Sequence, residues 1–243
     1  MLADGQHRVT MFHLRVIRDE THDGAFNMAV DEFLFRRQIR GNDQNPVLRF
    51  YQFSEPTVTV GYGVWRTIRS DLNGNVPAIR RITGGGIVHH GPDLTYSLVA
   101  PVICHKAFRK VRESYFLIHD ELRRSLNHLG IETQLFDQDY ETSASCVSKQ
   151  PEQNAHCFDS PVSFDLMLDG RKVAGAGQKR SLGFLLHQGS IAWNVLSESY
   201  PHLQIPDFIR QFSRSLAELF NLPVKEIPLD AEETKDIKEF NFA

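Results

Sequence analysis

Residues 162–174 read VSFDLMLDGRKVA and carry the most specific local signal in the chain. Apolar Val162, Phe164, Leu166 and Leu168 occupy every second position, which is the period of a β-strand with one buried face. The dipeptide Asp169-Gly170 that follows suits a type I′ turn, because both residue types tolerate positive φ. The segment therefore predicts a β-hairpin whose second strand begins directly after the turn.

Helical and strand-like segments surround this hairpin. Apolar residues at helical spacing predict helices after Gly24, over residues 107–129 and over residues 208–220, with Pro223 ending the last. Short runs rich in β-forming residues predict strands at 47–53, 57–62, 94–102 and 184–193. Because strands and helices do not alternate regularly, we expect an α+β or mixed α/β fold. We expect this fold to form one domain over residues 1–222, followed by a charged tail over residues 223–243.

Composition limits the class of protein. The 243 residues include 27 Lys and Arg against 30 Asp and Glu, for a formal net charge of −3, and 41% are hydrophobic. These values are typical of a globular protein and argue against a dedicated nucleic-acid binder. No apolar stretch approaches the roughly 20 residues of a membrane helix, and the N-terminus lacks the apolar core of a signal peptide. We therefore expect a cytoplasmic protein that does not bind membranes.

Residues 80–90, RRITGGGIVHH, form the segment best suited to bind a ligand. Two arginines, one hydroxyl and three consecutive glycines can surround a carboxylate, a phosphate or an acyl carbonyl. No Gly-Lys-Ser/Thr follows, and the spacing is not that of a dinucleotide fingerprint. The alternative is an ordinary glycine-rich turn with solvated arginines.

Lys172 and Cys157 are candidates for catalysis. Lys172 follows the hairpin turn and precedes small residues, so its ammonium can hold an oxygen of a ligand; the alternative is a lysine that faces solvent. Cys157 can act as a nucleophile if a nearby cation lowers the pKa of its thiol; the alternative is an inert buried thiol. Three histidines are further candidates for acid/base or orienting roles, or are structural: His89, His90 and His187.

The three cysteines, Cys104, Cys146 and Cys157, are an odd number with no CxxC spacing, which favours free thiols over disulfides. Together with His105 and His156 they supply ligand types for zinc, but in no recognised ligand spacing. We therefore expect no metal site.

In combination the segments resemble the lipoate-protein ligase and octanoyltransferase family, which shares its catalytic fold with biotin-protein ligases. The resemblance covers about residues 26–193. It rests on NMAVDE at 27–32, VGYG at 60–63, RRITGGGIVH at 80–89, KVAGAGQ at 172–178 and HQGSI at 187–191. It implies a mixed β-sheet flanked by helices, a tunnel for an octanoyl or lipoyl chain, and a target lysine on a lipoyl domain.

The resemblance also implies roles for individual residues. Lys172 matches the lysine that contacts the acyl carbonyl, and Arg81 and the glycine loop line the acyl or acyl-adenylate site, with His89 beside them. The full set expected at the substrate is Tyr62, Arg81, Thr83, Gly84, Gly85, Gly86, His89, Gly175 and Ala176.

Two segments are similar to the octanoyltransferases of this family that form an acyl-enzyme, namely CFDSP at 157–161, followed by Phe164-Asp165, and HGPDLTYS at 90–97. The chain also ends about where the catalytic domain ends, with no separate accessory domain. This version of the family implies transfer of octanoate or lipoate from acyl carrier protein through a Cys157 thioester to the lysine of a lipoyl domain, without a cofactor. The acceptors it implies are the lipoyl domains of 2-oxoacid dehydrogenases or the glycine cleavage H protein.

The alternative is an ATP-dependent lipoate-protein ligase. It would activate free lipoate or octanoate with ATP and Mg²⁺ as lipoyl-AMP and modify the same lysine. The triple glycine, intact at Gly86, is also common in ligases.

Overall fold

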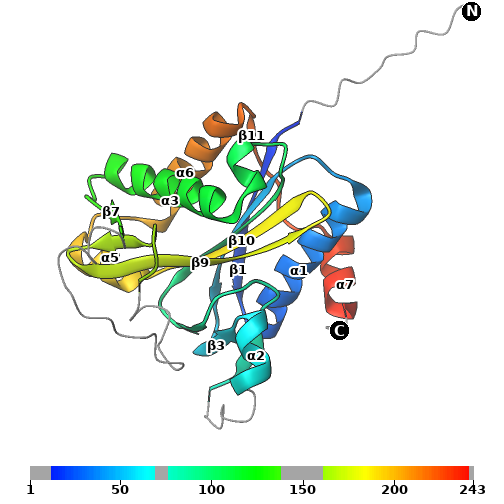
Figure 1. Cartoon of the computed structure of the whole chain (residues 1–243). Helices are drawn as coiled ribbons and strands as arrows, with labels where there is room; N and C mark the ends of the chain where they lie inside the picture. Colours follow the sequence, from blue (N-terminus) through cyan, green and yellow to red (C-terminus); the bar gives the residue numbers. More distant parts are fainter. Residues whose placement is uncertain (1–11, 69–75, 138–160, 241–243) are drawn as a thin grey trace, which may run out of the picture.

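The computed structural model describes residues 12–68, 76–137 and 161–240 (Figure 1). An eight-stranded mixed sheet and a three-stranded sheet form its centre, which confirms the expected mixture of strands and helices. The large sheet runs in the order β11 (Val224–Glu226), β1 (Leu14–His22), β2 (Val47–Phe53), β6 (Leu94–Pro101), β10 (Phe184–Ile191), β9 (Arg171–Ser181), β8 (Leu166–Leu168) and β7 (Gln134–Leu135). The small sheet runs β4 (Ala78–Arg80), β3 (Thr57–Val60) and β5 (Ile87–His90).

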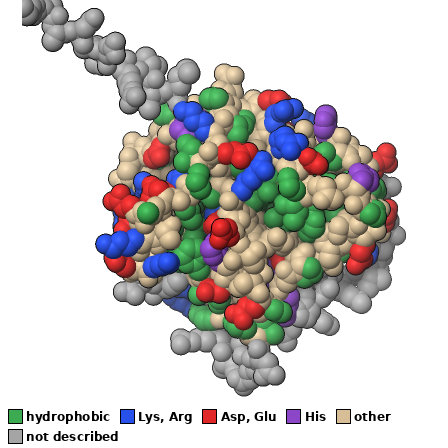
Figure 2. Space-filling model, turned by 180° about the vertical axis from the view of Figure 1, so that it is seen from behind, with side chains coloured by type: hydrophobic (Ala, Val, Ile, Leu, Met, Phe, Trp, Pro, Cys, Tyr) green, Lys and Arg blue, Asp and Glu red, His purple; other side chains and the backbone are tan. Residues whose placement is uncertain are grey.

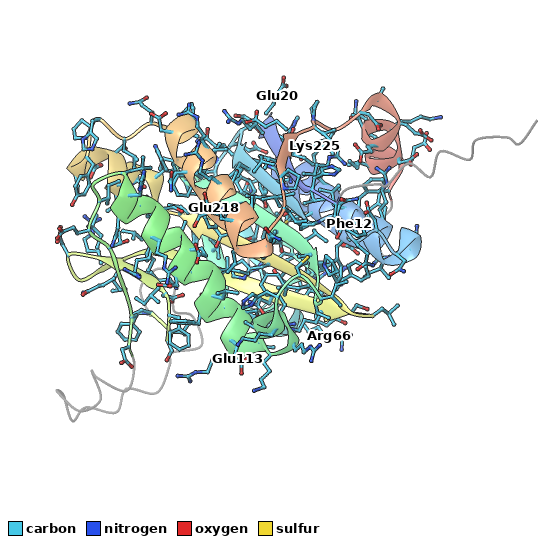
Figure 3. All side chains as sticks on the ribbon, turned by 90° about the horizontal axis from the view of Figure 1, so that it is seen from above. Phe12, Glu20, Arg66, Glu113, Glu218 and Lys225 are labelled. Carbon is cyan, nitrogen blue, oxygen red and sulfur yellow. The ribbon has the colours of Figure 1, made fainter. Side chains whose placement is uncertain are left out.

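Helices cover both faces of the large sheet. On one face α1 (Gly24–Gly41) packs with α7 (Ala231–Glu239), and on the other α3 (Val111–His128) lies beside α6 (Ile205–Phe220), as Figure 3 shows from above. Each face therefore encloses its own apolar core. Shorter helices are α2 (Tyr62–Ile68), the 3-10 helix η1 (Lys106–Arg109) and α5 (Trp193–Ser199). Within the described ranges no helix combines the length and apolarity required to cross a membrane.

Local signals explain where the main helices begin and end. The Asp23 side chain accepts a hydrogen bond from the Phe26 amide at 2.8 Å and so caps α1. Asn42 and Asn221 adopt left-handed conformations that end α1 and α6, with φ of 47° and 54°. The three predicted helices are confirmed, but η1 and α3 share the segment expected as one helix.

The hairpin is present, but its first strand is shorter than predicted. Asp169 and Gly170 have φ of 48° and 74°, as the predicted turn requires. The strand starts at Leu166 rather than at Val162, because Phe164 has a φ of 76° and the Asp165 carboxylate accepts a hydrogen bond from the Val162 amide at 2.8 Å. This turn directs the Asp165 side chain inward.

Two further strand predictions extend too far. The strand expected over 57–62 ends at Val60, since Tyr62 begins α2, and the strand expected over 184–193 ends at Ile191, since Trp193 begins α5. Both helices start with an aromatic residue that strand propensity alone assigns to the preceding strand.

The segment expected as a charged tail adds two elements to the fold. β11 pairs in parallel with β1, and α7 packs on α1. Arg15 on β1 hydrogen-bonds both oxygens of Glu233 on α7, at 2.7 and 2.8 Å. Residues 224–239 are therefore attached to the sheet by the pairing of β11, by the Arg15–Glu233 ion pair and by the buried side chain of Ile237. On the opposite face to that of Figure 1, basic and acidic side chains are interspersed over the surface (Figure 2).

A buried polar network connects α1 with the centre of the large sheet. Arg49 on β2 is fully buried and donates hydrogen bonds to Asp31 at 2.9 Å, Asp19 at 2.8 Å and the Asn27 side chain at 2.7 Å. Asp31 is also fully buried and accepts three more hydrogen bonds, from Tyr51, Ser97 and Gln188, at 2.7 to 2.8 Å. One carboxylate thus fixes α1 to β2, β6 and β10.

We predict that Asp31→Ala destabilises the protein by about 3–5 kcal/mol, because it leaves the Arg49 guanidinium buried without its central partner. Urea unfolding followed by circular dichroism measures the change. Asp207→Ala is the control, since Asp207 pairs with Arg210 on the surface and exposed pairs contribute about 1 kcal/mol or less. Equal losses in the two variants would contradict the central role of Asp31.

Candidate active site

The glycine loop packs against the edge of β9. The Gly84 amide donates a hydrogen bond to the Gln178 carbonyl at 3.2 Å. A Cβ atom at Gly177 would lie 2.4 Å from the Gly84 oxygen, and one at Gly61 would lie 2.0 Å from the Gly85 oxygen. Any side chain at Gly61 or Gly177 would therefore displace the loop.

Arg81 holds the same loop from inside. Its buried guanidinium donates hydrogen bonds to the carbonyls of Thr59 at 3.0 Å, Gly84 at 2.9 Å and Gly86 at 3.0 Å. Thr83 is buried as well and donates to the Gln188 side chain at 2.7 Å, which in turn hydrogen-bonds Asp31. The loop is thereby tied to the polar network of the sheet.

A narrow inner cavity of about 30 Å³ lies beside Arg81. Arg81, Gly175 and Ala176, three of the residues expected at the substrate, line it. Met28, Tyr51 and Val88 supply apolar wall, and the remaining lining comes from Thr59, His90, Thr95, Gly177, Gln188, Gly189 and Ser190.

A wider outer cavity of about 480 Å³ contains two other expected residues, Lys172 and His89. A Cβ atom at Gly175, which lines the inner cavity, would lie 2.8 Å from Lys172 Nζ. The Lys172 ammonium therefore sits where the two cavities approach each other. The absence of a side chain at Gly175 makes room for it.

Lys172 is paired with a carboxylate to which sequence reasoning assigned no catalytic or binding role. Its Nζ lies 2.7 Å from Asp165 Oδ2, and the two side chains are 3% and 0% exposed. The Tyr115 hydroxyl of α3 donates to the other oxygen of Asp165 and accepts a hydrogen bond from the Ala176 amide at 3.0 Å. Burial and the Asp165 charge raise the pKa of Tyr115 well above its usual value, so this hydroxyl stays protonated.

His90 and Asp93 form a second buried pair between the cavities. The Asp93 carboxylate lies 2.7 Å from His90 Nδ1 and accepts a hydrogen bond from Ser190 at 2.7 Å. Burial alone would raise the pKa of Asp93, but these partners outweigh it and hold the pKa at about 2. The other ring nitrogen of His90 lies 2.8 Å from the Thr59 hydroxyl, so His90 has a structural role.

Two further histidines are buried next to Tyr115, away from both cavities. His187 contacts the Tyr96 hydroxyl and the Gln178 side chain, each at 3.1 Å, and burial lowers its pKa well below the usual value. Burial likewise lowers the pKa of His119 to about 4. Both imidazoles are therefore neutral at neutral pH. Among the three histidines named as candidates from the sequence, His89 lines the outer cavity and His90 lines the inner one.

The structure separates Tyr62 from the other expected residues. It lies on α2 with 43% of its surface exposed and lines a different cleft. Thr83, Gly84, Gly85 and Gly86 belong to the loop segment without lining either cavity. Cys157 lies outside the described residues, as does Cys146, and within the described ranges no three potential metal ligands gather.

Sequence reasoning gave no role at the site to Asp165, Tyr115 or Asp93, although Asp165 and Asp93 stand in the segments that resemble the octanoyltransferases. Asp165 occupied a polar position of the predicted strand, and Tyr115 was counted in the apolar stripe of a helix. The hydrogen bond between Tyr115 and Asp165 joins residues 50 positions apart in the sequence. Local periodicity therefore cannot predict it.

The chain matches the family model of the lipoyl protein ligase A/B catalytic domain over residues 23–240. An octanoyltransferase LipM from Exiguobacterium sp. is 33% identical over 193 residues, which are 78% of this chain and 68% of the relative. An octanoyltransferase LipM from Oceanobacillus iheyensis is 28% identical, with 91% of this chain and 90% of the relative aligned.

Two solved structures share the fold. A lipoate-protein ligase A bound with ATP has a TM-score of 0.65 at 18% identity, and the putative lipoate protein ligase Ta0514 from T. acidophilum, with bound lipoic acid, has 0.66 at 20%. Each alignment covers 94% of both chains.

Burial of neutral His119 predicts a loss of stability in mild acid. Histidine in an unfolded chain titrates near pH 6.5, so between about pH 6.5 and 4 the unfolded state binds a proton that the folded state does not. His119→Gln should remove about 3 kcal/mol of the stability lost between pH 7 and 4, as measured by urea unfolding at each pH. His128→Gln, on the exposed side of the same helix, is the matched control. An unchanged acid profile in His119→Gln would refute the prediction.

Proposed function

The chain belongs to the lipoyl protein ligase A/B catalytic domain family, and we propose from this membership that it is an octanoyltransferase of lipoate metabolism. It moves an octanoyl or lipoyl group from acyl carrier protein to the target lysine of a lipoyl domain. The observation that carries the proposal is the buried Lys172–Asp165 pair between an inner and an outer cavity. Such a pair places a hydrogen-bond donor at a junction where an acyl carbonyl can sit.

The inner cavity receives the acyl chain in this proposal. Its wall contains Met28, Tyr51 and Val88, which suit a hydrocarbon. At about 30 Å³ the cavity has room for only a water molecule or two, so an eight-carbon chain has to widen it. The outer cavity, which opens on Lys172 and His89, receives the thioester and then the incoming lysine.

The reaction proceeds in two steps. The Cys157 thiolate attacks the carbonyl of the carrier thioester; a carbon–sulfur bond forms, the old one breaks, and the carrier leaves as a thiol after taking up a proton. The lysine amine of the lipoyl domain then attacks the acyl-enzyme, loses a proton and forms an amide, which releases the Cys157 thiolate. The donor is already activated, so transfer needs no ATP or other cofactor.

Lys172 stabilises the oxyanion in both steps. Asp165 and Tyr115 act as positioning residues, because their hydrogen bonds fix the carboxylate that holds the Lys172 ammonium. Burial strengthens the interaction of a cation with a developing negative charge, since water is excluded. Within the cytoplasm, where we place the protein, the thiol of Cys157 stays reduced.

We predict that incubation with octanoyl-acyl carrier protein gives a hydroxylamine-sensitive octanoyl adduct on Cys157, followed by ATP-independent modification of a lipoyl domain. Intact-mass spectrometry detects both products. Cys157→Ala should abolish both, because the nucleophile is lost, and Cys104→Ala is the control. Modification that requires free octanoate or lipoate with Mg-ATP, and no adduct, would show a ligase instead.

Lys172→Met should slow formation of the acyl-enzyme by about 10²–10³, the usual effect of removing one oxyanion donor. Because the single change leaves Asp165 buried and unpaired, the double variant Lys172→Met/Asp165→Asn removes both charges and tests the role in a stable fold. Rapid-quench measurement of the acyl-enzyme gives the rates, with Arg214→Met on the exposed side of α6 as control. Wild-type rates in the double variant would exclude Lys172 from the chemistry.

A further inference from the structure

A positively charged cleft lies on the outer side of the glycine loop, apart from the two cavities of the site. It measures about 370 Å³, and its walls come from α1, α2, β4 and β9. Tyr62, Arg80 and Lys179 line it together with the apolar side chains of Phe35 and Ile82.

Three cations surround the exposed ring of Tyr62. The Arg66 and Arg80 guanidinium carbons lie 5.8 and 5.6 Å from the ring centre, and the Lys179 ammonium lies 5.4 Å from it. These distances are in the range of cation–π contacts, which hold the long side chains near one another.

Among the described residues that line the cleft, Glu32 is the one carboxylate, and it pairs with Arg36 on the same helix. Arg66 and Lys179 therefore add positive charge beside Tyr62, in a chain whose formal net charge is −3. A local basic patch on a chain of opposite net charge directs the approach of an anionic partner to one place.

The cleft shares its walls with the site. Arg80 precedes Arg81, whose guanidinium holds the glycine loop, and the Tyr62 amide donates a hydrogen bond to the Thr83 carbonyl at 3.0 Å. Lys179 follows Gln178, whose carbonyl accepts the Gly84 amide. A partner seated in the cleft would thus be held beside the loop that Arg81, a residue of the inner cavity, holds in place.

We propose that this cleft docks the anionic surface of the carrier protein that delivers the acyl thioester, an inference that rests on the proposed function. An acyl carrier attaches its acyl group through an arm that contains a phosphodiester, so both the arm and an acidic protein surface present anions to Arg66, Arg80 and Lys179. Arginine and lysine are the side chains that bind phosphate and carboxylate groups. The acceptor offers a lysine, whose cationic or neutral amine gains nothing from this cluster.

Charge reversal at two of the cations tests the docking. Arg66→Glu/Lys179→Glu should raise KM for octanoyl-acyl carrier protein about tenfold or more, with kcat within about twofold, since charges at the rim act on association. Transfer from octanoyl-pantetheine, which lacks the phosphate and the carrier, should stay at the wild-type rate. The neutral variant Arg66→Gln/Lys179→Gln should give an intermediate KM. Added salt should raise KM for octanoyl-acyl carrier protein more in the wild-type enzyme than in either variant.

Lys225→Glu/Lys235→Glu is the matched control, because it makes the same change of charge on β11 and α7. Arg66 and Lys225 lie on opposite sides of the molecule in Figure 3. The control should keep the wild-type KM for the carrier.

Three results would overturn the inference. They are an unchanged KM for the carrier in the charge-reversed variant, an equal loss with octanoyl-pantetheine, and a raised KM for the lipoyl domain alone, which would assign the cleft to the acceptor. A wild-type protein that transfers from neither octanoyl thioester would instead refute the proposed function, and the docking with it.

Discussion

The contact between Arg49 and Asp31 is the constraint on which the rest of the structure depends. A guanidinium and a carboxylate, both without exposed surface, meet at 2.9 Å between α1 and the middle of the large sheet. Burying two charges is costly unless every donor and acceptor is matched, so the position of α1 relative to β2, β6 and β10 is fixed by geometry rather than by apolar packing alone. The same carboxylate holds Gln188, and through Gln188 it holds Thr83 at the base of the glycine loop. The hydrogen bonds of the core therefore also fix the position of the glycine loop.

The geometry of the site depends on close contacts between backbone segments as much as on side chains. Gly61 and Gly177 allow the loop to lie against β3 and β9, and Gly175 makes room for Lys172. Around these close contacts the chain arranges charges in compensated pairs, Lys172 with Asp165 and His90 with Asp93. Each pair borders a cavity, so neither cavity exposes an uncompensated charge from these four groups. A site arranged in this way keeps fixed dipoles near a reacting carbonyl without needing to rearrange them during the reaction.

Much of this arrangement could be predicted from the sequence, and the remainder could not for physical reasons. Periodicity located the main helices and the central strands, because one face of each is buried in an apolar core. It missed β1, whose outer half is polar, and α7, which is highly charged and buries Glu233 and Ile237. Motifs pointed to Lys172, Arg81 and the loop; Arg81 lines the inner cavity, Lys172 lines the outer one, and the loop is bonded to Arg81. Motifs also grouped Tyr62 with these residues, although nearness in a motif does not fix which side of the loop a side chain faces. Asp165 and Tyr115 depend on a turn with positive φ at Phe164 and on a contact across 50 residues, which no local pattern reports.

In the proposed reaction, the small size of the inner cavity favours long acyl groups over short ones. With room for only a water molecule or two, the pocket has to be forced open, and the free energy for that comes from burying the incoming hydrocarbon. Each methylene contributes about 0.8 kcal/mol on burial, so an acetyl group has about 5 kcal/mol less to offer than an octanoyl group. For the proposed octanoyl transfer, a narrow resting pocket therefore favours octanoyl over acetyl thioesters without a contact specific to either. Selectivity for a long chain would then depend on the free energy needed to widen the pocket as well as on the residues that line it.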